Sequence, residues 1–159
     1  MCVHLQVIIC PLWSDNTMPI LRDVGKCMKW CVKRTELRGR TGFPQYCSGL
    51  SYALSTPLLA QLYNASKSTP FFWIDDVYVT GLLTRKLPTA VRYVNTLSNV
   101  QLDQDAALRL YRNLSEPMRY YYVHGWDETK FMQLWRTLIG RLTPAQREMM
   151  SDAALSRWT

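Results

Sequence analysis

The sequence predicts an α/β fold in which a mixed sheet is flanked by helices. Its 159 residues are 48% apolar and 12% aromatic, which is enough for one packed core. Short apolar runs typical of strands occupy the first third, whereas clear helix-start signals begin near residue 56. No internal repeat or Gly/Ser linker divides the chain. We therefore expect residues 1–159 to belong to a single domain.

Most strands are expected early in the chain. The predicted strands, in order, are Val3 to Ile9, Lys29 to Val32, Tyr46 to Leu54 and Met118 to His124. Pro11 ends the first, because proline cannot donate to a strand ladder. Gly49, in the third, permits close approach of a ligand or of another backbone segment. Alternation in the fourth would place Tyr120, Tyr122 and His124 on one face.

Two helices are expected in the middle of the chain. Thr56 is predicted to cap the first, with Pro57 at its first helical position. Asp75 is predicted to cap the second, which runs from Asp76 towards Lys86. The residues expected on their buried faces are Leu58, Leu59, Leu62 and Ala65 in the first helix and Val79, Leu82 and Leu83 in the second.

Further helices are expected after residue 100. Asp103 or Asp105 begins one that reaches Arg112, and Asp127 begins an amphipathic one. The apolar face of the latter comprises Phe131, Leu134, Trp135 and Leu138. Thr143-Pro144-Ala145-Gln146 has the form of a capping box and predicts a last helix.

The net charge of +7 is concentrated between Arg22 and Arg40, where seven Lys or Arg residues accompany two acids. A positive field raises the local concentration of any polyanion. No stacking aromatics alternate with these charges, so a solvated basic loop is favoured over a nucleic-acid surface.

The cysteines and the absence of an apolar span bear on the compartment. Five cysteines lie in the first third, and their odd number leaves at least one thiol free or paired with another chain. Cys27 and Cys31 lack the further ligands of a zinc site. Disulfides and the sequons at Asn64 and Asn113 would favour the secretory pathway. No run approaches the roughly 18 apolar residues of a membrane span, and Val3 to Cys10 lacks signal-peptide features. The cysteines are Cys2, Cys10, Cys27, Cys31 and Cys47.

Asp75 and Asp76 directly follow four apolar residues, Phe71 to Ile74. Desolvating adjacent carboxylates is unfavourable, so such a pair needs a partner, a metal or a chemical task. In a first helical turn, Asp76 would meet unpaired amides and the positive end of the helix dipole, which favour the ionised form that can accept a proton. On spacing alone, helix capping is the better explanation of the two acids.

Three motifs taken together resemble one enzyme family. They are Pro44-x-Tyr46-Cys47-Ser48-Gly49, Tyr52-x-Leu54-Ser55 and Asp75-Asp76-Val77-Tyr78-Val79-Thr80-Gly81. Their order resembles the galactosyltransferases of glycosyltransferase family 31, the β-1,3-hexosyltransferases. The resemblance implies the C-terminal, acceptor-side part of a GT-A type, Rossmann-like fold. It also implies inverting transfer of galactose or N-acetylglucosamine from a UDP-sugar to a hydroxyl of a glycan or glycoprotein in the Golgi lumen.

The resemblance also implies roles for individual residues. Asp76 falls at the position of the base that deprotonates the acceptor, and Asp75 would orient the acceptor or the helix start. Tyr46, Ser48 and Gly49 lie where the family's chain passes close to a sugar. Many members carry a run of glycines here, whereas Leu50 and Ser51 follow Gly49 in this chain.

Three more residues are candidates for ligand contacts. Trp30 and Trp73 would stack on sugar faces, although each is also explained as a core or rim aromatic. His124 resembles a late histidine that completes the family's site for a divalent metal, Mn²⁺. The other interpretation is a half-buried histidine satisfied by local hydrogen bonds.

Several family features have no counterpart in these 159 residues: the upstream Asp-x-Asp-like motif, the uridine pocket and the membrane anchor. We therefore expect a truncated hexosyltransferase domain that is inactive alone and would reach the Golgi membrane only through a missing anchor. The rival hypothesis is a non-catalytic basic module, in which Arg22 to Arg40 binds an anionic glycan or nucleic acid. Its affinity would fall with salt and would not depend on divalent metal.

Overall fold

The computed structural model describes residues 6–113, 122–123, 125 and 127–145. The chain divides into two compact units, Met1–Ser98 (unit 1) and Asn99–Thr159 (unit 2). The described residues of both contain short strands and helices, so the predicted mixed α/β class is confirmed. That both units belong to one glycosyltransferase domain stays a prediction.

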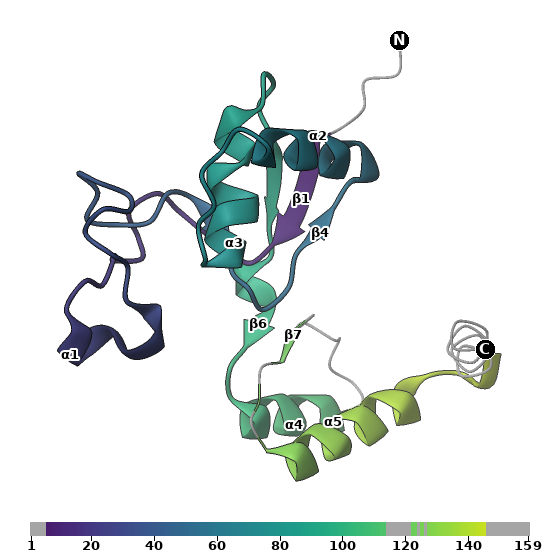
Figure 1. The fold of residues 1–159 in the computed structure, drawn as a ribbon. Coiled ribbons are helices and arrows are strands. Elements are labelled where there is room, and N and C mark those ends of the chain that lie inside the picture. Colours follow the sequence, from purple (N-terminus) through teal and green to yellow (C-terminus); the bar gives the residue numbers. More distant parts are fainter. Residues whose placement is uncertain (1–5, 114–121, 124, 126, 146–159) are drawn as a thin grey trace, which may run out of the picture. The chain divides into compact units, whose positions relative to one another are not determined.

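Unit 1 is built around a small mixed sheet (Figure 1). Its central strand, β1 (Val7–Cys10), pairs antiparallel with β4 (Ala53–Leu54) and parallel with β5 (Arg92–Asn95). A second, two-stranded ladder joins β2 (Leu12–Trp13) to β3 (Tyr46–Cys47). Because β2 directly follows β1, this ladder fixes the Tyr46–Cys47 segment beside the end of the central strand.

Two of the predicted strands are wrong. The single strand expected from Tyr46 to Leu54 is divided into β3 and β4, which pair with different partners on either side of a turn at Gly49. The strand expected from Lys29 to Val32 is not formed: α1 (Val24–Cys27) leads into a 3₁₀ turn, η1 (Met28–Trp30), and the next two residues are in neither a helix nor a strand. A disulfide joins Cys27 to Cys31 with their Cα atoms 4.8 Å apart. An extended strand would separate such residues by about 13 Å.

The first middle helix, α2 (Thr56–Ser66), has Pro57 in its first turn as predicted, but its N-cap is Ser55. The Ser55 hydroxyl accepts a hydrogen bond from the Val7 amide at 3.3 Å and does not cap its own helix. Leu58 and Leu62 are buried as expected, whereas Leu59 is 55% exposed.

The helical stretch predicted from Asp76 to Lys86 is present but changes type along its length. It comprises α3 (Asp75–Val77), a π-helical turn, η2 (Tyr78–Leu82), and a 3₁₀ turn, η3 (Thr84–Lys86). Leu83 N–H donates to the Tyr78 carbonyl at 2.9 Å, five residues back, as a π turn requires. Ile74 occupies the N-cap position, so the prediction that Asp75 is the cap was wrong.

Close packing explains the glycine in the π turn. A Cβ added to Gly81 would lie 3.0 Å from the Gln45 carbonyl oxygen and 3.1 Å from Tyr46 Cβ. The turn therefore lies directly on the segment that leads into β3. The core of unit 1 joins this helical stretch to the sheet and to α2 through Ile8, Cys10, Leu58, Leu62, Phe72, Ile74, Val77 and their neighbours.

Two short strands and two helices make up the described part of unit 2. β6 (Val100–Gln101) pairs parallel with β7 (Tyr122–Val123), and α4 (Gln104–Arg112) packs with α5 (Glu128–Arg141). The predicted caps are confirmed: the Asp103 carboxylate accepts from the amides of Asp105 and Ala106, and Asp127 accepts from Lys130. Among the described residues of this unit, the buried apolar cluster comprises Ala107, Leu108, Tyr111 and Leu134.

Other predictions for the second half are corrected or untested. Phe131 is 54% exposed and Trp135 is 45% exposed, so the apolar face expected for α5 is only partly buried. Of the strand predicted from Met118 to His124, only Tyr122 and Val123 lie within the described residues. Most of the helix predicted from Thr143 onwards also falls outside them. No helix in the described part of the chain is long and apolar enough to cross a membrane.

Candidate active site

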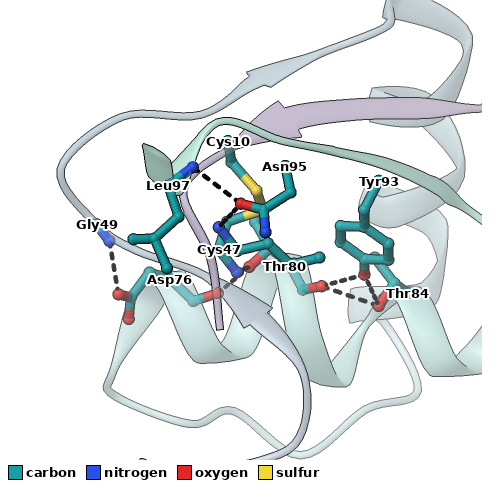
Figure 2. Close-up of a disulfide and its surroundings, with 10 residues drawn as sticks. Cys10, Cys47, Gly49, Asp76, Thr80, Thr84, Tyr93, Asn95 and Leu97 are labelled. Atoms are coloured by element: carbon teal, nitrogen blue, oxygen red, sulfur yellow. Dashed lines mark hydrogen bonds between the residues drawn. A yellow bond between two sulfur atoms is a disulfide. The ribbon is translucent and has the colours of Figure 1, made fainter. Parts of the chain in front are cut away.

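The Asp76 carboxylate joins the two sequence motifs that lie furthest apart in unit 1. Asp76 is half-buried in the first turn of α3, and its Oδ2 accepts a hydrogen bond from the Gly49 amide at 2.8 Å (Figure 2). Its Oδ1 accepts from the Val77 amide at 2.8 Å. A Cβ added to Gly49 would lie 3.1 Å from Oδ2, so a glycine permits this approach. The helix start and the Tyr46–Gly49 segment thus form one site.

The environment of Asp76 increases its affinity for a proton. Burial raises the pKa of this carboxyl group, the amides of Val77 and Gly49 oppose the shift, and the negative charge of Asp75 adds to it. The net result is a pKa above the ordinary value of 3.8. A carboxylate with a raised pKa is a stronger base than an exposed one, provided that it is still ionised at the working pH.

Two tyrosines lie within the electrostatic reach of the acid pair. Burial, assisted by the charge of Asp76, raises the pKa of Tyr46 to about 12. Burial and the charges of Asp75 and Asp76 also raise the pKa of Tyr52. Both phenols therefore stay protonated at neutral pH. Tyr46 is 7% exposed and packs edge-on against Phe43, with the ring centroids 5.9 Å apart. It is therefore chiefly a core residue.

The structure places the remaining polar candidates of the two motifs around this point. Asp75, beside Asp76, is exposed. Ser48 is half-buried, and its amide donates to the Pro11 carbonyl at 2.8 Å. This bond extends the β2–β3 ladder by one residue and holds the backbone that leads into Gly49.

Residues that the sequence patterns did not single out as functional hold the backbone on both sides of the Asp76–Gly49 contact. The Thr80 hydroxyl accepts from the Cys47 amide at 2.9 Å and donates to the Asp76 carbonyl at 2.5 Å (Figure 2). A disulfide joins Cys47 to Cys10 at the end of β1. One of these contacts could have been predicted from the sequence. Thr80 lies four residues after Asp76, which is the spacing at which a helical threonine can donate to a backbone carbonyl. The sequence offered no means of choosing Cys10 among four potential partners.

The side chain of Tyr93 attaches the π turn to the sheet. Its hydroxyl, on β5, donates to the Thr80 carbonyl at 2.6 Å and lies 3.0 Å from the Thr84 hydroxyl (Figure 2). The helix that carries Asp76 is therefore fixed both to β3 and to β5.

Trp30 and Trp73 form a stacked pair. Their ring centroids are 6.1 Å apart with 15° between the ring planes. Both side chains are partly exposed, at 49% and 37%, and the ammonium of Lys29 lies 4.7 Å from the Trp30 ring centroid. The pairing brings two predicted sugar-binding residues together, with Trp73 only two positions before Asp75.

The described residues do not form a metal site. Among them, no group of three or more His, Cys, Asp or Glu side chains could hold an ion. Both oxygens of Asp76 already accept amide hydrogen bonds. His124, the predicted metal ligand, lies outside the described residues.

Part of the basic loop serves the fold. Arg22 donates to the backbone carbonyls of Lys33, Glu36 and Leu37. Arg40 forms an ion pair with Asp15 at 2.6 Å and donates to the Gly42 carbonyl at 3.0 Å. Both guanidinium groups are bonded to acceptors of the protein itself, which leaves fewer basic groups for the rival function of binding a polyanion.

Comparison with known proteins identifies the class. The sequence profile of the Galactosyltransferase family matches residues 16–95, half of the chain, and the matched range contains the Tyr46–Gly49 segment and the acid pair. The chain therefore belongs to this glycosyltransferase family.

Individual relatives agree with this assignment. Beta-1,3-galactosyltransferase 5 of Homo sapiens is 39% identical over 72 residues, covering 45% of this chain and 22% of the relative. The mouse protein of the same name is 40% identical over 62 residues, covering 39% and 20%. UDP-GalNAc:beta-1,3-N-acetylgalactosaminyltransferase 1 of Homo sapiens is 25% identical over 105 residues, covering 64% and 29%. The chain thus matches between a fifth and three tenths of the length of these relatives.

Proposed function

We propose that this chain carries the acceptor-side part of an inverting β-1,3-hexosyltransferase with a GT-A type fold, and that Asp76 is its catalytic base. One observation carries the proposal. Within the family-matched range, a half-buried carboxylate of raised pKa is held against the backbone of the Pro44 to Gly49 motif by the Gly49 amide. A base held rigidly beside a substrate-binding segment is what deprotonation of a bound alcohol requires.

In the proposed reaction, an acceptor hydroxyl donates its proton to Asp76 while its oxygen attacks the anomeric carbon of the donor sugar. A glycosidic C–O bond forms on one face as the C–O bond to the diphosphate breaks on the other, so the configuration inverts. The nucleoside diphosphate leaves with the bonding electron pair. Asp75, exposed beside the base, would orient the acceptor. Neither aspartate is assigned a role as a metal ligand.

Membership of the family supports a nucleotide-sugar donor and a sugar acceptor. We propose UDP-galactose or UDP-N-acetylglucosamine as the donor and a hydroxyl of a glycan or glycoprotein as the acceptor. The stacked Trp30–Trp73 pair would pack against the C–H face of a sugar ring. The disulfides Cys10–Cys47 and Cys27–Cys31 support a lumenal location, because disulfides persist in oxidising compartments such as the secretory pathway.

The test is a chimera that supplies the remainder of a catalytic domain. Residues 16–95 of this chain, the family-matched range, replace the corresponding segment of human beta-1,3-galactosyltransferase 5, and sugar transfer from each UDP-sugar is measured. We expect Asp76→Asn to lower kcat by about 10²- to 10⁴-fold with little change in the KM for the donor.

The control is Asp23→Asn, which removes the same charge from an exposed loop position in the family-matched range. It should leave kcat unchanged. Thermal unfolding of each variant establishes that folded protein is being compared. Turnover by a folded Asp76→Asn chimera equal to that of the unmutated chimera would reject Asp76 as the base.

A further inference from the structure

We propose that the Thr80 hydroxyl is a positioning group that holds Asp76 at the Gly49 backbone. The inference deepens the proposed function, since it concerns the residue that would place the base. It assigns to Thr80 a task that neither the sequence motifs nor the comparisons assign.

The hydroxyl of Thr80 has no contact with solvent, and it both accepts and donates a hydrogen bond. Thr80 is 0% exposed. An amide nitrogen can only donate and a carbonyl oxygen can only accept. The bond from Cys47 N–H to Oγ1, at 2.9 Å, and the bond from Oγ1 to the Asp76 carbonyl, at 2.5 Å, therefore fix both the direction and the rotamer of this hydroxyl.

The bond to the Thr80 hydroxyl and the bond from the Gly49 amide connect the same two segments, residues 47–49 and residues 76–80, at two points. Cys47 and Gly49 lie two residues apart on the strand side, and Asp76 and Thr80 lie four residues apart on the helix side. One bond joins Cys47 to Thr80, and the other joins Gly49 to the Asp76 carboxylate (Figure 2). A pair of segments joined at two points cannot rotate about either contact, so the position of the Asp76 carboxylate depends on both.

Each side of this arrangement is anchored in the core. Cys47 is held by its disulfide to Cys10 and by its pairing with Leu12. Thr80 lies in the π turn, where the Tyr93 hydroxyl donates to its carbonyl. Thr80 is thus the point at which the strand is joined to the helix that carries the Asp76 carboxylate.

Thr84 offers a matched control on the same helix. Its hydroxyl also bonds back to helix carbonyls, those of Thr80 and Gly81, each at 3.0 Å. It is joined to Tyr93 and not to Cys47 or Asp76. Thr80→Val and Thr84→Val therefore remove the same group from two turns of one helical stretch, the π turn and the 3₁₀ turn, and only the first should release Asp76.

The experiment uses the full 159-residue chain and does not depend on turnover. NMR titration of the Asp76 side-chain carboxyl carbon and hydrogen exchange of the Gly49 and Cys47 amides are measured for the unmutated chain, Thr80→Val, Thr80→Ser and Thr84→Val. We expect Thr80→Val to shift the titration midpoint of Asp76 and to accelerate exchange at both amides by about tenfold or more. Thr80→Ser, which keeps the hydroxyl, should restore both, and Thr84→Val should change neither.

A merely structural role gives a different result. If Thr80→Val lowers the melting temperature while the Asp76 titration and the Gly49 exchange rate match those of Thr84→Val, the positioning role is rejected. The proposed function is judged separately, by the effect of Asp76→Asn on kcat in the chimera. Normal turnover of that variant would reject the base and leave the measured coupling between Thr80 and Asp76 unaffected.

Discussion

Two of the helices that begin beside an aspartate, α3 and α4, use the carboxylate in different ways. Asp103 caps α4: it is exposed, and it accepts hydrogen bonds from the amides of Asp105 and Ala106 in its own helix. Asp76, at the start of α3, is half-buried and reaches the Gly49 amide, 27 residues away in sequence. The first carboxylate completes a helix, whereas the second links the helix to another segment.

The pKa values of the two carboxyl groups are shifted in opposite directions. Hydrogen bonds from Ala106 and Asp105, opposed by partial desolvation and aided by Arg109 and Lys130, hold the pKa of Asp103 below 3.8. Burial holds the pKa of Asp76 above that value. An acid whose ionised form is disfavoured by burial, and whose carboxylate also bonds to a distant segment, is the better candidate for chemistry.

Loss of the Cys10–Cys47 disulfide is expected to have the largest effect on stability, because it closes the longer loop and holds the partner segment of Asp76. The two cysteines are 37 residues apart, against four for Cys27 and Cys31. Loop-closure entropy predicts a destabilisation of about 4 kcal/mol for the Cys10→Ser/Cys47→Ser variant and about 2 kcal/mol for Cys27→Ser/Cys31→Ser.

Denaturant unfolding measures both values, and hydrogen exchange at Gly49 and along α4 shows where each variant loosens. The first variant should accelerate exchange at Gly49 and leave the α4 amides unchanged. Equal losses for the two variants would contradict the ranking by loop length.

The close packing beneath Asp76 should be sensitive to a single methyl group. Gly81→Ala would place a Cβ 3.0 Å from the Gln45 carbonyl oxygen and force the π turn away from β3. We expect a loss of about 1–3 kcal/mol in the free energy of unfolding. The control is Gly140→Ala in α5, where an added Cβ meets nothing within 4 Å among the described residues.

Gly140→Ala should be neutral or stabilising by up to about 1 kcal/mol, since alanine is the better helix former. Thermal unfolding of both variants provides the measurement. A stabilising Gly81→Ala would show that the π turn is not packed against β3 as described.

Removal of the Asp103 cap should have a smaller and strictly local effect. Asp103→Ala leaves the amides of Asp105 and Ala106 without their acceptor, and we expect their exchange to accelerate roughly fivefold. Exchange at Gly49 should not change. Asp103→Asn, which retains an acceptor oxygen, is the control and should behave much like the unmutated chain. Acceleration at Gly49 would show that the two helix starts are coupled.

The same contrast explains what the sequence could predict of the fold. The caps of α4 and α5 were predicted correctly because a capping aspartate accepts hydrogen bonds from amides two or three residues away. Such a contact can be predicted from the local sequence alone. The strand expected at Lys29 to Val32 was wrong because the disulfide to Cys31 imposes a turn. The division of the Tyr46 to Leu54 strand depends on pairing with β2 and β1, which no local pattern specifies.

The candidate site shows the same limit. The two motifs that hold Asp76 and Gly49 were found in the sequence, and the structure brings them within hydrogen-bonding distance. The residues that fix this contact were not found, because Thr80 bonds across 33 positions to Cys47 and the disulfide spans 37. Trp30 and Trp73 were each predicted as aromatic contacts, but their stacking on one another was not.

The opposite pKa shifts of Asp76 and Asp103 predict that the free energy of unfolding depends on pH in opposite ways for the two groups. We expect this to be the smallest of the effects predicted for the two helix starts. Folded Asp76 binds a proton more tightly than unfolded Asp76, so the free energy of unfolding should fall as the pH rises from about 3.8 to the raised folded pKa. Folded Asp103 releases its proton more readily, so its contribution should be lost as the pH falls from about 3.8 to its lowered folded pKa. Denaturant unfolding at intervals between pH 2.5 and roughly 7 measures both slopes.

Asp76→Asn should remove the fall in the free energy of unfolding above pH 3.8, and Asp103→Asn should reduce the loss of stability on the acid side. If Asp76→Asn instead steepened the fall, burial would not be the dominant influence on this carboxyl group, and the distinction between the two helix starts would rest on geometry alone.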